Sequence, residues 1–78
     1  MAGNPDEFVR IEVALDGGQI LSALVTTTSA ADLERALNAS VNSTLALEAQ
    51  DGTIHVVVPR VLYVKRFARE GRVGFGPS

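Results

Sequence analysis

The most regular alternation of hydrophobic and polar positions in this chain runs from Thr53 to Phe67, in the stretch TIHVVVPRVLYVKRF. Every second residue from Ile54 to Val58 is apolar, and the β-branched and aromatic content of the stretch is typical of extended strands. Pro59 interrupts the pattern, because proline has no backbone N–H to offer to a sheet ladder. We therefore predict a strand over Ile54 to Val58 and then, over Val61 to Phe67, a separate strand or a sharply bent continuation.

A second alternating stretch lies near the start of the chain and predicts a hairpin. Phe8 to Leu15 places four apolar side chains on one face and Arg10 and Glu12 on the other, which is typical of a strand with one solvated side. The turn sequence Asp16-Gly17-Gly18-Gln19 follows, and its Asp-Gly and Gly-Gly steps favour the positive φ angles of tight hairpin turns. A second strand over Gln19 to Thr27 should therefore return antiparallel, with its core face formed by Leu21, Ala23 and Val25.

Helical periodicity appears after this hairpin. Ser29 is a favourable N-cap residue, and Asp32, three residues later, suits the positive end of a helix. A helix over Ala30 to Ala39 would carry an apolar stripe of Leu33 and Leu37 with alanines beside it. The opposite side would expose Glu34, Arg35 and Asn38 to water. Because so short a helix is unstable alone, it should lie against the sheet.

A third strand is predicted over Leu45 to Gln50, and the Asp51-Gly52 turn connects it to the strand that starts at Ile54. The elements predict a single α+β domain over residues 8–67, in the order β-β-α-β-β with a further strand after Pro59. Its antiparallel sheet of four to five strands would have one short helix on one face and would either stay open or curl toward a small barrel. We expect residues 1–7 to form a flexible leader and residues 68–78 a basic, glycine-rich tail.

Composition narrows the classes of function. The 78 residues include no cysteine, which excludes disulfides, thiolate chemistry and cysteine-based metal sites, and which fits a reducing compartment. No apolar run approaches the roughly 18 residues of a membrane span, and no signal peptide opens the chain. We therefore expect a cytoplasmic protein that does not enter a membrane, and we expect no metal and no cofactor.

The sequence contains no recognisable catalytic constellation. His55 is the single histidine, and its neighbours Asp51 and Thr53 lie at a turn, so an exposed or cross-strand position suits it better than a general base. The glycines of GRVGFG, residues 71–76, reverse the order of the dinucleotide fingerprint and precede no helix, so they predict a tail. The remaining candidates for acid and base chemistry fall on solvated strand or helix positions, and they are Glu12, Asp32, Glu34 and Glu48. We do not expect an enzyme.

Charge is distributed unevenly along the chain. Residues 1–59 hold eight of the nine acidic side chains, whereas residues 60–78 hold five of the seven basic ones. Alternation in the last strand would set Leu62, Val64 and Arg66 on one face and Val61, Tyr63, Lys65 and Phe67 on the other. Two aromatic rings beside a lysine are similar to a base-stacking platform. The predicted binding residues, for a polyanion or for a protein partner, are Arg60, Tyr63, Lys65, Arg66, Phe67, Arg69 and Arg72.

Two functions follow from these features. The first is a non-catalytic interaction module that forms a homo-oligomer, because a small core and the exposed outer strands of two hairpins leave surface that self-association would cover. The alternative is binding of a polyanion, either RNA, DNA or an acidic protein, through the basic residues. A third interpretation of the same residues is structural: Tyr63 and Phe67 would be core or interface residues, and Lys65 would protect a sheet edge from mispairing.

Several segments resemble an uncharacterised family of short actinobacterial proteins, some of which are labelled putative ATP-binding proteins. These segments are the opening VRIEV, the helix TSAADLERALNAS, the Asp51-Gly52 turn, RVLYV and the terminal GRVGFG. A second resemblance is to Sm-like RNA-binding barrels, in the strand pattern of the first hairpin and of VVVPRVLYV. That resemblance implies a curled sheet and RNA as a partner, but the barrels have no helix between their second and third strands.

Overall fold

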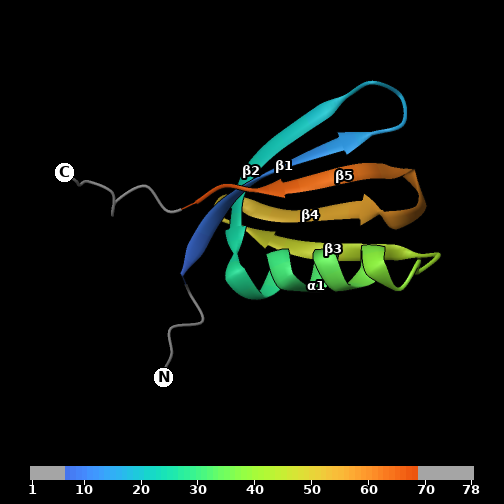
Figure 1. Cartoon of the computed structure of the whole chain (residues 1–78). Helices are drawn as coiled ribbons and strands as arrows, with labels where there is room; N and C mark the ends of the chain where they lie inside the picture. The colour runs from blue at the N-terminus through green and yellow to red at the C-terminus, as the bar shows by residue number, and fades with distance from the viewer. Residues whose placement is uncertain (1–6, 69–78) are drawn as a thin grey trace.

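A computed structural model describes residues 7–68 of the chain, and these residues form the predicted α+β fold (Figure 1). Five antiparallel strands make one sheet in the order β4-β3-β2-β1-β5, so the sheet is open, with β4 and β5 at its two edges. The first six residues of the predicted leader and residues 69–78 of the predicted tail lie outside the described residues. The elements are β1 (Phe8–Leu15), β2 (Ile20–Thr26), α1 (Thr27–Asn38), β3 (Thr44–Ala49), β4 (Gly52–Val57), the 3-10 turn η1 (Val58–Arg60) and β5 (Val61–Arg66).

The chain after Pro59 forms a separate strand, which was one of the two predicted outcomes. Proline stands in the first turn of η1, where a missing N–H costs nothing, and Val58 belongs to this turn rather than to the preceding strand. The turn redirects the chain so that β5 pairs with β1 and not with β4. A bulge between Ala14 and Leu15 sets Val61 opposite Leu15, on the core side. The predicted position of Val61 on the same face as Tyr63 is therefore wrong.

The core lies between α1 and one face of the sheet. Leu33, Ala30 and Ala36 of the helix are buried, as the apolar stripe predicts. They meet the side chains that the strand alternation turned inward, and the buried cluster consists of Ile11, Val13, Val25, Ala30, Leu33, Leu47 and Val56. Figure 1 shows α1 lying along one side of the sheet next to β3. Within residues 7–68, no helix is long and apolar enough to cross a membrane.

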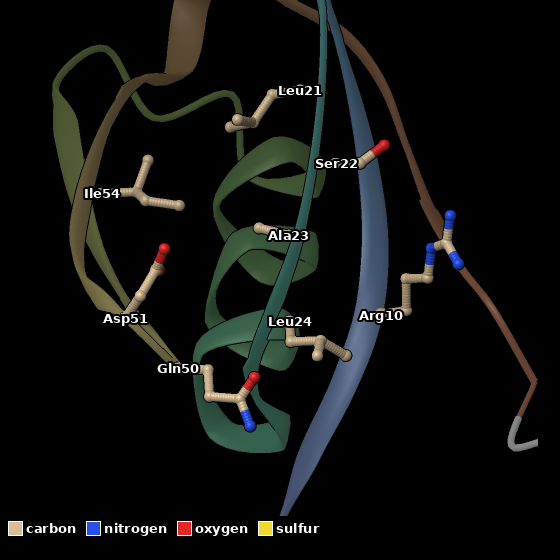
Figure 2. A pocket seen from close by; sticks show the side chains of 8 residues that line it. All are labelled: Arg10, Leu21, Ser22, Ala23, Leu24, Gln50, Asp51 and Ile54. Carbon is tan, nitrogen blue, oxygen red and sulfur yellow. The ribbon is translucent and has the colours of Figure 1, made fainter.

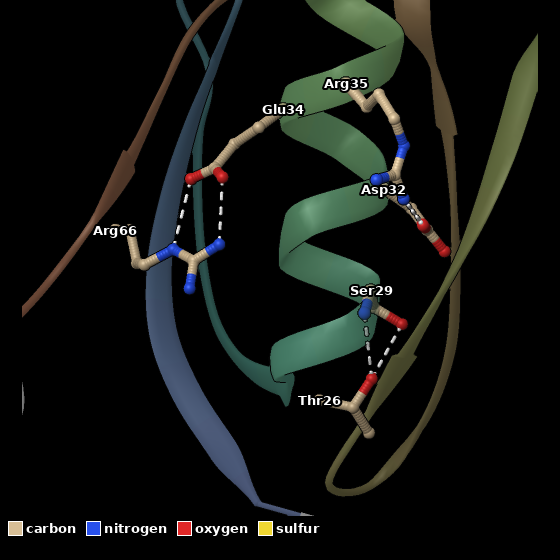
Figure 3. Close-up of polar contacts among 6 residues, drawn as sticks. All are labelled: Thr26, Ser29, Asp32, Glu34, Arg35 and Arg66. Atoms are coloured by element: carbon tan, nitrogen blue, oxygen red, sulfur yellow. Dashed lines mark hydrogen bonds and ion pairs between the residues drawn. The ribbon is translucent and has the colours of Figure 1, made fainter. Parts of the chain in front are cut away.

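The start of α1 differs from the prediction. The N-cap is Thr26, whose Oγ1 accepts a hydrogen bond from the backbone N–H of Ser29 at 3.0 Å, and the helix begins three residues before the predicted start. Ser29 lies in the first turn and is 5% exposed. Its Oγ accepts hydrogen bonds from the Thr26 hydroxyl and from the backbone N–H of Glu48 on β3, both at 2.9 Å. Asp32 binds Arg35 and not the helix terminus (Figure 3).

The end of α1 is a Schellman motif, in which backbone N–H groups beyond the helix bind its last carbonyls. The Val41 N–H donates to the Ala36 carbonyl at 3.0 Å, and the Ser40 N–H donates to the Leu37 carbonyl at 3.2 Å. Ser40 adopts φ 56°, and it is the one non-glycine residue with positive φ among residues 7–68. A residue with a side chain is strained in this left-handed region, whereas glycine adopts the region without strain.

Candidate interaction surface

No residue between 7 and 68 covers the surface that β2, β1 and β5 turn away from α1, and we call this surface the outer face. Register defines its three rows: Ile20, Ala14 and Tyr63 form the first, Ser22, Glu12 and Lys65 the second, and Leu24 and Arg10 begin the third. Ala14 is buried between its two large neighbours, whereas Ile20 is 60% exposed, Tyr63 45% and Leu24 40%. Large apolar side chains of the outer face are therefore exposed within the described residues.

Phe67 ends the third row and lies between two cations. Its backbone N–H donates to the Arg10 carbonyl at 3.0 Å, which extends the β1–β5 ladder by one residue. The Arg10 guanidinium carbon lies 5.1 Å from the centre of the Phe67 ring, and the Lys65 Nζ lies 4.7 Å from it. Both distances are within the range of cation–π attraction. The structure thus brings together Lys65 and Phe67, as predicted, and adds Arg10, which sequence spacing did not suggest.

The predicted basic residues that the structure describes, Arg60, Lys65 and Arg66, do not form one patch. The Arg66 guanidinium makes a bidentate contact with the Glu34 carboxylate of α1, at 2.8 and 3.1 Å (Figure 3). Glu34 is therefore paired and not simply directed to water. Arg60 pairs with Asp16 of the β1–β2 turn at 3.2 Å. Pairing reduces the charge that either arginine offers to a polyanion, and Arg69 and Arg72 lie outside the described residues.

Tyr63 points its hydroxyl at an acidic neighbour. The Tyr63 OH donates to the Glu12 carboxylate at 2.7 Å, across the β1–β5 ladder. This hydrogen bond holds the pKa of Tyr63 above its ordinary value, because the neutral phenol is the form that donates, and the negative charge of Glu12 acts in the same direction. The ring is consequently held along the outer face.

The sheet opens between β2 and β3. β2 pairs with β1 over its whole length but with β3 only at Val25 and Ala49, and a hydrogen bond from the Gln50 N–H to the Leu24 carbonyl adjoins that pair. Between Ile20 and Ala23, one edge of β2 has no neighbouring strand among residues 7–68. We call this edge, from Ile20 to Leu24, the β2 edge. No pattern in the sequence indicates it, because the hairpin register alone does not say where β3 leaves β2.

A cleft follows the β2 edge. Leu21 and Ala23 of β2 point into it from one side and Ile54 of β4 from the other, with α1 behind them (Figure 2). The part beside the β3–β4 turn has a volume of about 620 Å³, and an adjoining hollow beside the β1–β2 turn has about 410 Å³. Charged residues stand at both ends, Arg10 and Asp51 at the first and Asp16 and Arg60 at the second.

The residues considered for acid and base chemistry lie on four different elements, β1, α1, β3 and β4. His55 is exposed on β4, and Glu48 is exposed on β3. Three other carboxylates have separate partners, with Glu12 bound to Tyr63, Asp32 to Arg35 and Glu34 to Arg66. In the described part of the chain, no three or more histidine, aspartate or glutamate side chains gather as a metal site would require. The candidate site within the described residues therefore consists of the outer face and the β2 edge.

Comparison with known proteins returned no match: no family model matches the chain, and no curated protein and no solved structure is significantly similar to it. The resemblances to the actinobacterial family and to Sm-like barrels therefore stay predictions.

Proposed function

We propose that this chain is a non-catalytic interaction module that associates with a second copy of itself. The observation that carries the proposal is the outer face, where Ile20, Leu24 and Tyr63 remain exposed because α1 covers only the opposite side of the sheet. Complete burial of a fully exposed apolar side chain contributes about 1.5–3 kcal/mol, and these side chains, 40–60% exposed, would gain part of that on association. A domain of this size, which buries a small core, gains more from that contribution than a large one would.

The polar groups of the outer face suit a protein partner. Arg10, Glu12 and Lys65 present both signs of charge within two neighbouring rows, so two copies can meet without an excess of like charge. Tyrosine and arginine are also the residues that most often dominate the energy of protein interfaces. Both are present here, and Tyr63 is oriented by its hydrogen bond to Glu12.

The decisive experiment measures molar mass against concentration by light scattering. The wild type should rise from the 8.2 kDa of one chain toward twice that value, and Ile20→Ser should shift the transition to higher concentration. Leu62→Ser is the matched control, because Leu62 is 67% exposed but belongs to no row of the outer face. A wild type that stays at the mass of one chain up to millimolar concentration would refute self-association.

Binding of a single-stranded nucleic acid is the second candidate, and the observation that favours it is Phe67 between Arg10 and Lys65. A base stacked on the ring would place its phosphates near both cations. Arg35, Arg60 and Arg66 are paired with carboxylates, so only Arg10 and Lys65 would be engaged among residues 7–68. Log K should then fall against log salt with a slope of about −1.4. A titration at low salt tests this candidate with Lys65→Glu and, as its control, Arg35→Glu, and absence of binding by the wild type would eliminate it.

A further inference from the structure

We infer that self-association occurs by antiparallel pairing of the β2 edge with the β2 edge of a second copy, which joins two sheets into one. This inference rests on the proposed function and specifies how the two copies meet. It requires that β2 offer free backbone groups, that the cleft accept the side chains of a second β2, and that the charges at the two ends not oppose the pairing. The structure bears on each requirement.

The backbone groups of the β2 edge point outward. The Leu15 N–H donates to the Gln19 carbonyl at 2.9 Å, so the odd-numbered residues of β2 bond to β1 and the even-numbered ones turn their N–H and C=O groups the other way. Of these outward groups, the Leu24 carbonyl is already bound by the Gln50 N–H. Ile20 and Ser22 keep theirs free within the described part of the chain. An identical antiparallel strand would satisfy both, with Ile20 of each copy opposite Ser22 of the other.

The side chains of a second β2 fit the space on both sides of this edge. The pairing places Leu21 of the second copy beside Leu21 in the cleft, opposite Ile54, where about 620 Å³ is open. On the other side, the pairing places Ile20 of the second copy beside the outer face of the first, where Ile20 and Leu24 are exposed. One contact therefore accounts for three features of the molecule: the unpaired edge, the cleft and the exposed ends of two outer rows.

The charges at the two ends of the β2 edge do not oppose this pairing. The Leu24 end of the β2 edge carries Arg10 and Asp51, and the Ile20 end carries Asp16 and Arg60. Each end therefore carries one cation and one carboxylate, and pairing two copies brings no excess of like charge together at either end. The Asp16–Arg60 pair is exposed and can rearrange at little cost.

The test substitutes proline at a position whose backbone N–H is used only in the proposed contact. Ser22→Pro removes an N–H that no group in the described monomer uses, and an edge strand tolerates such a proline. Thr53→Pro is the matched control, because the Val58 N–H donates to the Ser43 carbonyl and Thr53 on β4 consequently also points its N–H outward. We expect Ser22→Pro to weaken dimerisation about tenfold or more, and Thr53→Pro to leave it unchanged.

Cysteine pairing gives a readout that does not depend on proline, and the chain has no cysteine of its own. An equal mixture of Ile20→Cys and Ser22→Cys should form a mixed disulfide on mild oxidation, whereas Ile20→Cys with Thr53→Cys should not. If Ser22→Pro dimerises like the wild type and the mixed disulfide is absent, edge pairing is refuted while self-association stands. If the wild type does not dimerise at all, the proposed function fails and the inference fails with it.

Discussion

Replacement of Ser29 by alanine should destabilise the fold far more than replacement of its exposed neighbour Thr28. The Ser29 hydroxyl is buried, and it accepts one hydrogen bond from the Thr26 hydroxyl and one from the Glu48 N–H, so it joins the start of α1 to β3. Each hydrogen bond contributes about 1 kcal/mol, and the loss of both predicts about 2 kcal/mol. For a domain of this size, that corresponds to a fall in Tm of about 8–16 °C.

Thermal unfolding followed by circular dichroism measures this change, at one protein concentration so that association does not alter the comparison. The Tm of Ser29→Ala should lie well below that of the wild type, and the Tm of Thr28→Ala should equal that of the wild type. If the two variants melt together, the hydrogen bond from Glu48 to Ser29 does not stabilise the protein, and the reasoning is wrong.

A pair of aspartate variants separates the observed N-cap from the one that the sequence suggested. Aspartate is at least as good an N-cap as threonine, so Thr26→Asp should fold with nearly the stability of the wild type, because the Ser29 hydroxyl can donate to the new carboxylate. Ser29→Asp would bury a charge and should lose more stability than Ser29→Ala. The reverse order would indicate that Ser29 is the N-cap.

Three further predictions concern single contacts. Ser40→Gly should raise the stability by about 1 kcal/mol in a urea titration, because glycine adopts the left-handed conformation of Ser40 without strain; a loss of stability would contradict this. The chain has one tyrosine and no tryptophan, so tyrosinate absorbance against pH reports Tyr63 alone, and Glu12→Gln should lower its raised pKa toward the ordinary value. Because the raised pKa favours the neutral phenol in the fold, this contact stabilises the protein below the ordinary pKa and ceases to do so as the pH rises through the raised one. Glu34→Gln should change the stability by less than about 1 kcal/mol, since its ion pair with Arg66 is exposed, but should strengthen retention on a polyanion resin if Arg66 is then free to bind it.

The sequence by itself determined which elements form and, apart from Val61, which of their residues face inward. Alternation over Phe8–Leu15, the glycine turn after it, and the leucine stripe of α1 all act within a few residues, and local backbone geometry turns each of them into a strand, a turn or a helix. The inward positions were therefore predictable as well, since Ile11, Val13 and Leu33 follow from the period of their own element.

Only the tertiary structure decided which remote residues meet. β5 lies beside β1, which brings Arg66 to Glu34 and Tyr63 to Glu12, and neither partner could be read from spacing because the contact depends on strand order. Serine is a favourable N-cap residue, but Ser29 does not cap α1. Its hydroxyl instead accepts a hydrogen bond from the backbone N–H of Glu48 on β3. Within residues 7–68, β3 pairs with β2 only at Val25 and Ala49, while Leu47 of β3 is fully buried in the core beneath α1, so the rest of the β2 edge has no neighbouring strand there. At Ser29 a contact with an element distant in the sequence overrode the local pattern, and in the other places no local pattern specified the contact.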